Sequence, residues 1–308
     1  MHRAFIAVLA LSTPVIGIAQ HDTDILFGAG NAIVRVVQPQ PHPIRTMSSV
    51  QGFFLSDVGM DFYYPDGANQ PMLQTCTVRT VYIAPGITGN KSGVGNVFCA
   101  SGCPNQFVLP FNGTAHHHFI FSTSQRKVYV WDFRAVNARD IGGNPLVDDP
   151  QVYRVYFLTP GTARIGGQAD PSGHYRGDPY NLWITVQLKN GSTVLHSDSQ
   201  PINKHAVRDY LVGFDASGTF DVAAKLSKHL SRLAPAQTLG NVETSLNWAF
   251  PFLGDVNNDD IIDDADLAAV LASFGTNDST ADLDGDGLVD DVDLAIVLSN
   301  FGQAGEAR

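Results

Sequence analysis

Glutamate is almost absent from this chain of 308 residues: Glu243 and Glu306 are the only ones. Basic residues are also few, with 19 Lys and Arg, and they form no block. Without a basic patch we expect no nucleic-acid partner. The patterns G-x-S-x-G and H-E-x-x-H, which mark common hydrolase sites, do not occur either. The sequence therefore carries no ready signature of an enzyme.

Long apolar runs are missing after the first residues, "MHRAFIAVLALSTPVIGIAQ". This segment has a short basic start, an apolar run and small residues at Gly17 and Ala19, which predicts a secretory signal peptide over residues 1–19. A buried strand or a membrane anchor is the alternative, but the run is short and Pro14 interrupts it. We expect a mature chain without a membrane span that is secreted, extracellular or at the cell surface.

Cysteine is scarce, and its pairing stays open. In an exported protein, the "CASGC" stretch could close a small disulfide loop, because its Ser-Gly pair favours a turn. The third cysteine could instead pair with either of these two. A metal site is the sharper alternative, since three histidines follow at 116–118, although zinc sites commonly use a shorter C-x₂-C spacing. The three cysteines are Cys76, Cys99 and Cys103.

Short apolar stretches separated by turn residues predict a mainly β fold before the tail. Between Asp24 and about Val155 they include "NAIVRVVQ", "CTVRTVYIAPG" and "HHFIFSTSQRKVYVWDF", several with alternating polarity, as in a β-sandwich or barrel. Further on, Asn190-Gly191 between two β-type runs predicts a hairpin. The strand order from about Thr162 to Ala249 resembles prealbumin-like (carboxypeptidase-regulatory-like) β-sandwich modules.

The negative charge is concentrated at the C-terminal end. From Pro251 onward there are thirteen Asp, and the net charge of this tail is −13 against −11 for the whole chain. Two similar stretches, "DVNNDDIIDDADLAAVLASFG" and "DLDGDGLVDDVDLAIVLSNFG", begin 27 residues apart. The acidity therefore belongs to a repeated local motif and not to the chain as a whole.

The spacing of oxygen-bearing residues in each stretch predicts a calcium loop. Positions 1, 3, 5 and 12 supply side-chain oxygens, position 7 a backbone carbonyl, and position 9 a contact through water. We therefore expect two Ca²⁺ ions. The second loop has Gly287 at position 6, where the chain must turn, and the first has Asp260 there. The candidate ligands are Asp255, Asn257, Asp259, Ile261, Asp263 and Asp266 in the first loop, and Asp282, Asp284, Asp286, Leu288, Asp290 and Asp293 in the second.

Each loop is followed by apolar residues at helical spacing. We expect two short helices that bury these faces against each other, each ended by a glycine. The predicted fold class is thus mainly β: one or two β-sandwich domains followed by a small all-α pair of calcium loop–helix units. The apolar sets are Leu267, Val270, Leu271 and Phe274, and Leu294, Val297, Leu298 and Phe301.

Residues 251–303 resemble a type I dockerin, or a dockerin-like domain, through the doubled ligand register, the exit helices and Asp at position 12. The resemblance implies a cohesin-like or cell-surface partner read by positions 10 and 11. Here these are Asp264-Ala265 and Asp291-Val292, which differ from the Ser/Thr pair common in the family. An alternative role is a calcium-locked cap on the preceding sandwich. The expected boundaries are 1–19 signal peptide, 20–155 β-rich domain of unrecognised family, 156–250 β-sandwich module and 251–308 dockerin-like domain.

For the whole chain we expect a non-catalytic extracellular binding or structural protein. The alternative is a polysaccharide-degrading enzyme of glycoside hydrolase type, which needs two carboxylates. A metal held by His116 and His118, or a copper site at His21 if cleavage follows Gln20, are further alternatives to an ordinary polar strand. Aromatic loops at 61–67 and 174–183 are candidate polysaccharide contacts. The aspartates available for hydrolysis are Asp57, Asp61, Asp132 and Asp140.

Overall fold

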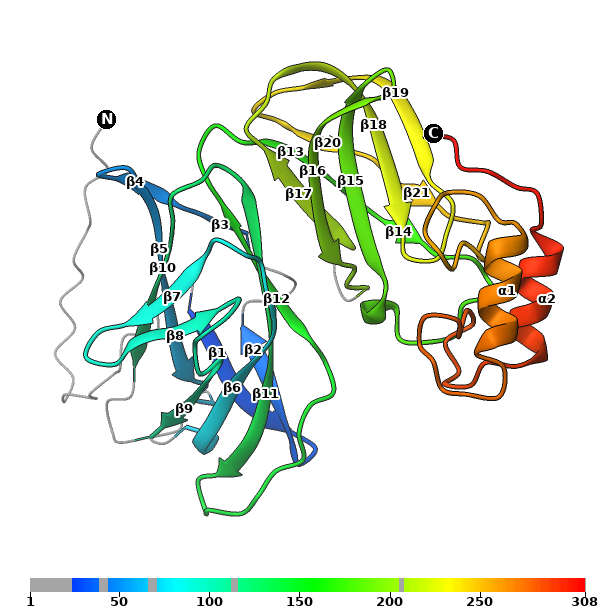
Figure 1. Cartoon of the computed structure of the whole chain (residues 1–308). Helices are drawn as coiled ribbons and strands as arrows, with labels where there is room; N and C mark the ends of the chain where they lie inside the picture. The colour runs from blue at the N-terminus through cyan, green and yellow to red at the C-terminus, as the bar shows by residue number, and fades with distance from the viewer. Residues whose placement is uncertain (1–23, 39–43, 66–70, 112–115, 205–207, 308) are drawn as a thin grey trace, which may run out of the picture.

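The computed structural model describes residues 24–38, 44–65, 71–111, 116–204 and 208–307. The expected signal peptide and His21 lie outside these residues. Two β-sandwiches follow one another along the chain, and two helices lie at the end away from the first sandwich (Figure 1). The mainly β fold is confirmed. Neither helix of the described chain has the length and apolarity needed to cross a membrane.

The first sandwich consists of a seven-stranded and a five-stranded sheet. The seven-stranded sheet has the order β2-β1-β5-β10-β7-β8, with β4 paired to β5, and the five-stranded sheet has the order β3-β12-β11-β6-β9. Apolar residues from both sheets, including Phe27, Phe119 and Trp131, share one core. The strands are β1 Ile25–Gly30, β2 Ile33–Gln38, β3 Ile44–Thr46, β4 Ser48–Val50, β5 Phe53–Phe62, β6 Leu73–Ile83, β7 Thr88–Lys91, β8 Gly95–Cys99, β9 Gln106–Pro110, β10 His117–Thr123, β11 Val128–Asp140 and β12 Tyr153–Leu158.

The second sandwich contains the predicted hairpin as β15 and β16, with Gly191 at positive φ in its turn. Its sheets have the orders β16-β15-β18-β19, β17-β13-β20 and β14-β21. Alternate residues of β15, Ile184, Val186 and Leu188, are fully buried in its core. The strands are β13 Ala163–Gly167, β14 Ala169–Asp170, β15 Trp183–Asn190, β16 Thr193–Pro201, β17 Tyr210–Phe214, β18 Gly218–Leu226, β19 Arg232–Leu239, β20 Glu243–Ser245 and β21 Trp248–Ala249, and a 3-10 turn spans Pro179–Asn181.

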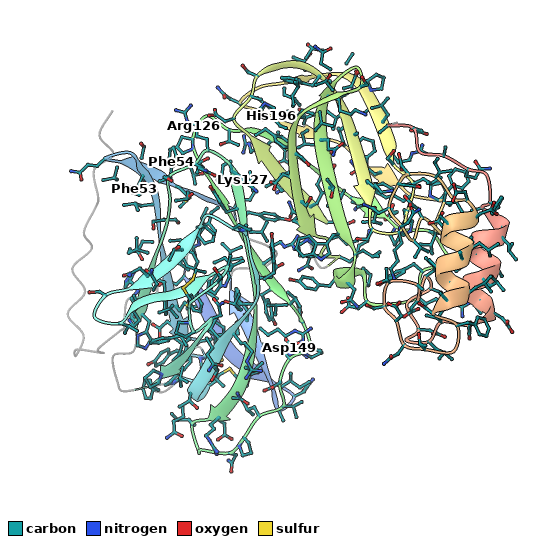
Figure 2. All side chains as sticks on the ribbon, in the orientation of Figure 1. Phe53, Phe54, Arg126, Lys127, Asp149 and His196 are labelled. Carbon is teal, nitrogen blue, oxygen red and sulfur yellow. A yellow bond between two sulfur atoms is a disulfide. The ribbon has the colours of Figure 1, made fainter. Side chains whose placement is uncertain are left out.

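A buried ion pair of the first sandwich is hydrogen-bonded to the second sandwich. The Arg154 guanidinium of β12 donates to both carboxylate oxygens of Asp132 on β11, at 2.7 and 2.8 Å, and both side chains are fully buried. Arg154 also donates to the Pro201 carbonyl, and the Tyr180 hydroxyl donates to Asp132. A second ion pair, Lys127 with Asp198 of β16, lies at the same junction (Figure 2). These contacts connect the first sandwich to the second. Arg154 and Asp132 are removed from water, so each depends on the other and on its hydrogen-bond partners for compensation of its charge.

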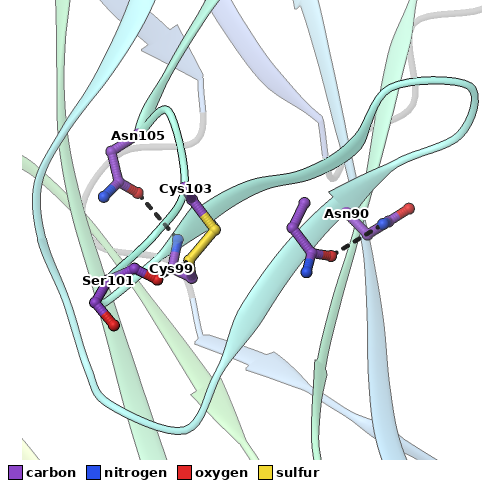
Figure 3. Close-up of a disulfide and its surroundings, with 6 residues drawn as sticks. Asn90, Cys99, Ser101, Cys103 and Asn105 are labelled. Carbon is purple, nitrogen blue, oxygen red and sulfur yellow. Dashed lines mark hydrogen bonds between the residues drawn. A yellow bond between two sulfur atoms is a disulfide. The ribbon is translucent and has the colours of Figure 1, made fainter.

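Two of the three cysteines are paired. Cys99 and Cys103 form a disulfide at the end of β8, and the Asn105 side chain accepts a hydrogen bond from the Cys99 amide beside it (Figure 3). Cys76 is free and buried, and burial raises the pKa of its thiol. The disulfide removes Cys99 and Cys103 from the metal site considered with the histidines.

The tail contains α1 Asp264–Ala272 and α2 Asp291–Ser299, each of nine residues and packed side by side (Figure 1). The expectation of a small all-α unit is not supported, because most residues after Pro251 form loops and turns. The tail has a small core of its own, which includes Ile262, Val270, Val289 and Val297. Leu230 from the second sandwich belongs to this same core, so the tail packs onto the sandwich.

Candidate functional site: two acidic loops on the second sandwich

Both acidic loops lead directly into a helix, and the same device begins each helix. Asp263 is the N-cap of α1 and forms a capping box with Asp266. Asp290 and Asp293 do the same for α2. A capping box satisfies helix-terminal N–H groups that would otherwise lack acceptors, and the acidic charge also favours the positive end of the helix dipole. Positions 9 and 12 of each loop are thereby held in place by the start of the helix.

The hydrogen bonds inside the first loop turn its side chains toward one another. The Asp255 carboxylate accepts from the Asp260 amide at 3.0 Å. Asn257 accepts from the Asp259 amide, and Asp259 accepts from the Ile261 amide, both at 3.0 Å. The Asp266 carboxylate closes the loop, since it accepts N–H groups from residues 256, 257 and 263.

The second loop repeats this pattern at positions 27 residues further on. Asp282 accepts from the Gly287 amide at 3.0 Å, Asp284 from Asp286 at 3.1 Å, and Asp286 from Leu288 at 2.9 Å. The carboxylate at position 12 accepts N–H groups from residues 283, 284 and 290. The two similar stretches thus share one pattern of hydrogen bonds, in which backbone N–H groups support the side-chain oxygens.

Two buried carboxylate oxygens in these loops have no hydrogen-bond partner. They are Oδ1 of Asp255 and Oδ2 of Asp284, and both residues are almost completely inaccessible to solvent. Burial raises the pKa of both carboxyl groups. In the second loop, carboxylate oxygens of Asp282, Asp284 and Asp293 lie within 4.8 Å of one another. A buried carboxylate oxygen without a partner is costly, and clustered carboxylates repel, so the donor set of the second loop fits a hard cation. In the first loop Lys225 Nζ donates to the other oxygen of Asp255.

Position 6 differs between the loops for a structural reason. Gly287 has φ +98° and Asp260 has φ +72°, so both take the left-handed conformation that this turn requires. The Asp260 carboxylate accepts from the Ser231 amide at 2.7 Å and from its hydroxyl at 2.5 Å, and Lys225 Nζ donates to it at 3.2 Å. Asp260 therefore attaches the first loop to β18 and the start of β19.

The second loop also contacts the sandwich, through its backbone. The Arg176 and Gly177 amides donate to the Asp284 carbonyl at 2.6 and 3.1 Å, and Lys228 Nζ donates to the Asp282 carbonyl. A Cβ atom at Gly177 would lie 2.9 Å from the Gly285 carbonyl oxygen, so the backbone segments at Gly177 and Gly285 are in close contact. Residues 176 and 177 are thus part of an internal contact between the second sandwich and the second loop.

The last residues return along β19. The Glu306 amide donates to the Ser231 carbonyl, and the Glu306 carboxylate accepts from the Leu233 amide and pairs with Arg232 at 3.0 Å. Figure 1 shows the C-terminus beside this strand. Sequence reasoning missed Lys225, Ser231 and the other sandwich residues that hold the tail, because they lie far from it in the chain and have no motif of their own.

The helices bury only part of the apolar face expected to pack between them. Val270 and Val297 are fully buried, but four of the apolar residues expected to pack between the helices are about half exposed. The predicted helix–helix face was wrong at these positions because the small core is completed by loop residues and Leu230. The exposed residues occupy equivalent places in the two repeats: Leu271 at 54% and Phe274 at 46%, Leu298 at 55% and Phe301 at 44%.

In the first sandwich, acidic and histidine side chains gather beside β5 and β10. His116 Nδ1 lies 3.6 Å from Asp24 and 3.5 Å from Asp61, and His118 Nδ1 lies 2.8 Å from Asp57. Burial raises the pKa of Asp61. The rings of His116 and His118 are 4.4 Å apart, so they do share one face of the sheet, as expected for alternate residues of a strand.

The other two aspartates considered for hydrolysis serve internal contacts. Asp132 is fully engaged by Arg154 and Tyr180, and the Asp140 side chain accepts from the Asn144 amide in an exposed turn. Asp132 and Asp140 are thus held by contacts within the fold, while Asp57 and Asp61 lie on β5, each beside a histidine.

Comparisons with known proteins give weak similarities only. No protein-family model matches the chain, and no curated protein matches its sequence. Two mutant forms of the type II cohesin–X–dockerin complex from Acetivibrio cellulolyticus are similar in structure, with 18% and 20% identity, TM-scores of 0.35 and 0.36, and coverage of 47% of this chain and 99% of theirs. The Bacillus anthracis TIE protein has 6% identity and a TM-score of 0.22 over 68% of this chain and 39% of its own. These values are too low to assign a family.

Proposed function

We propose that residues 251–308 form a dockerin-like module that binds two Ca²⁺ ions, one in each acidic loop. The observation that carries the proposal is the repeated loop geometry, with one buried carboxylate oxygen lacking a partner in each loop. In the first loop the ligands are Asp255, Asn257, Asp259, Ile261, Asp263 and Asp266, and in the second Asp282, Asp284, Asp286, Leu288, Asp290 and Asp293. Bound calcium would neutralise carboxylates that otherwise repel one another.

For the chain as a whole, the proposal is a secreted, non-catalytic binding or structural protein that uses this module for attachment or assembly. A signal peptide at residues 1–19, a β-rich domain over 20–155 and a prealbumin-like module over 156–250 complete the proposed organisation. The contacts of Asp260 and Asp284 with the second sandwich support a tail that is fixed to its neighbour. The module would then be presented as a rigid extension of the sandwich.

A cohesin-type protein partner is proposed for the exposed sides of the helices. Four half-exposed apolar residues lie at equivalent positions of the two repeats, and Val292 at position 11 of the second loop is also exposed by 40%. Exposed apolar clusters on soluble proteins often mark protein contacts. The four residues are Leu271, Phe274, Leu298 and Phe301.

Calorimetric titration of calcium-free full-length protein with CaCl₂ tests the ion sites. We expect two ions per chain, and one ion per chain in each of the variants Asp255→Ala and Asp284→Ala, because each removes a side-chain ligand from one loop. The matched controls are Asp264→Asn and Asp291→Asn, which change the neighbouring position 10 carboxylates outside the ligand register. If the position 10 controls weaken binding as much as the ligand variants, the charge of the tail and not the register governs binding, and the proposal fails.

A binding assay with immobilised type I and type II cohesins, in calcium, tests the partner. Binding should be lost in the double variant Leu271→Asp with Leu298→Asp and retained in Val194→Asp, which changes an exposed apolar residue on β16. Failure to bind either cohesin type would refute the cohesin-type partner while leaving the calcium sites to be judged by the titration.

A further inference from the structure

A cavity of about 630 Å³ lies between the second sandwich and the first acidic loop. Trp183, Thr185 and Gln187 of β15 line it from one side. They alternate with the fully buried residues of the same strand, so they face away from the sandwich core. The opposite side is the loop over residues 255–260, and Ala307 contributes the end of the chain. The volume falls within the usual range of ligand sites in proteins.

The two lysines that line this cavity are already engaged within the protein, and three carboxylates line it with them. Lys225 Nζ donates to the carboxylates of Asp255 and Asp260, and Lys228 Nζ donates to the Asp282 carbonyl. The Asp259 carboxylate accepts from the Ile261 amide. A ligand would therefore meet no uncompensated cation that calls for an anionic group. Electrostatics favour a neutral ligand here.

Polar groups and one aromatic ring remain for a ligand to contact. The Gln187 side chain makes no hydrogen bond within the described part of the chain, and it offers both a donor and an acceptor. Asn258 offers the same pair of groups from the loop opposite. The Thr185 hydroxyl is shared with Ser199 at 2.8 Å and can still accept.

Trp183 supplies a flat apolar surface at the edge of the cavity. Its side chain is 42% exposed, whereas the other two tryptophans, Trp131 and Trp248, are buried. The ring is held by an edge-on contact with Tyr82 at 5.2 Å between centroids, and the Trp183 backbone is paired with Ser227. An exposed indole held in one orientation is suited to stacking at little cost in conformational entropy.

We propose that this cavity binds a neutral oligosaccharide, with one sugar ring stacked on Trp183 and its hydroxyl groups bonded to Gln187 and Asn258. A sugar ring combines an apolar C–H face with a rim of hydroxyl groups that donate and accept, which matches an aromatic surface next to uncharged amides. The inference goes beyond the proposed calcium and attachment function and does not depend on the partner of the helices.

Fluorescence titration of the full-length protein, in one calcium-containing buffer, tests the proposal. The probes are cellohexaose, xylohexaose and mannohexaose as neutral chains, and a polygalacturonic acid hexamer as an anionic chain. Because Trp183 is the exposed tryptophan, a bound sugar should shift its emission and protect it from acrylamide quenching. We expect saturable binding of at least one neutral chain and weaker binding of the anionic one.

Variants on and off the cavity separate binding from folding. Trp183→Ala should weaken binding by about tenfold or more, and Trp183→Phe, which keeps a ring against Tyr82, by less. Gln187→Ala should weaken it about two- to tenfold through the lost hydrogen bonds. The matched control Gln106→Ala, on an exposed part of β9, should bind like the parent protein. Melting curves show whether each variant is folded. The proposal would be overturned if none of the three neutral chains bound, or if the anionic chain bound more tightly than they do. It would also be overturned if the folded variants Trp183→Phe, Trp183→Ala and Gln187→Ala all bound like the parent protein.

Discussion

Replacing Asp260 by glycine tests whether the tail is attached to the sandwich by its first loop. Glycine stands at this position of the second loop, and it removes the cost of a side chain at φ +72°. That gain is about 1 kcal/mol, and the extra freedom of glycine in the unfolded chain offsets most of it, by about 0.4–1 kcal/mol. On backbone grounds alone, Asp260→Gly is therefore close to neutral.

The contacts of the Asp260 side chain that are lost in Asp260→Gly determine whether the variant is less stable. The Asp260 side chain is only 15% exposed, and two hydrogen bonds from Ser231 end on its carboxylate. Hydrogen bonds to a charged group contribute about 1.5 kcal/mol each at the low end of their range, or about 3 kcal/mol together. Lys225 loses one of its two carboxylates as well. We therefore expect Asp260→Gly to weaken the docking of the tail by about 2–3 kcal/mol.

Amide hydrogen exchange at Gly254 and Glu306 measures this docking, since both amides donate across the contact to sandwich carbonyls that the substitution leaves in place, those of Lys228 and Ser231. A loss of about 2–3 kcal/mol corresponds to exchange faster by about 30- to 150-fold in calcium-saturated protein. The matched control is Gly287→Asp in the second loop, where an added Cβ meets no atom within 4 Å. This substitution strains the backbone at position 287 and leaves the contacts of Ser231 intact. Unchanged or slower exchange in Asp260→Gly would show that Asp260 is only a poor turn residue and would refute the reasoning.

Two further outcomes follow from buried groups. Asp132→Asn should destabilise the junction by about 3–5 kcal/mol by leaving the Arg154 charge buried and unpaired, and Tyr180→Phe by only about 1–2 kcal/mol; equal effects in denaturant titrations would contradict this. Burial lowers the pKa of His229 to about 4, and its ring accepts from the Ser172 amide. Between pH 6.5 and 4 only the unfolded chain takes up a proton at this histidine. The free energy of unfolding should therefore decrease by up to about 3 kcal/mol as the pH is lowered from 6.5 to 4, and it should decrease less in His229→Gln. Equal pH dependence of the two proteins would exclude His229 as the source.

Local patterns predicted the elements well where a short stretch of chain contains all the information. The hairpin at Asn190-Gly191 needs only two flanking strands and a turn, and it is present. The two helices after the acidic loops follow from the helical spacing of apolar residues, and they are present too. In each case the hydrogen bonds that define the element join residues close in sequence.

Contacts between distant residues could not be predicted in this way. Lys225 and Asp260 are 35 positions apart in the sequence, and no motif around Lys225 marks it as a partner of the first loop. The same holds for the helix faces: Leu271 has helical spacing with Leu267, yet it is exposed because Leu230 and loop residues fill the tail core instead. The sequence allowed several pairings of the three cysteines, and the structure contains the disulfide between Cys99 and Cys103.

Calcium-dependent folding of the tail is the claim that one measurement tests most directly. The two helices of the described chain begin at carboxylates that also belong to the proposed ion sites, so removing calcium should weaken both helix starts. Far-ultraviolet circular dichroism of the full-length protein, with excess EGTA and after calcium is restored, reports this change. The account predicts loss of the helical signal with EGTA, its recovery with calcium, and no recovery with magnesium at the same concentration. Helix content that stays unchanged after complete calcium removal would contradict it.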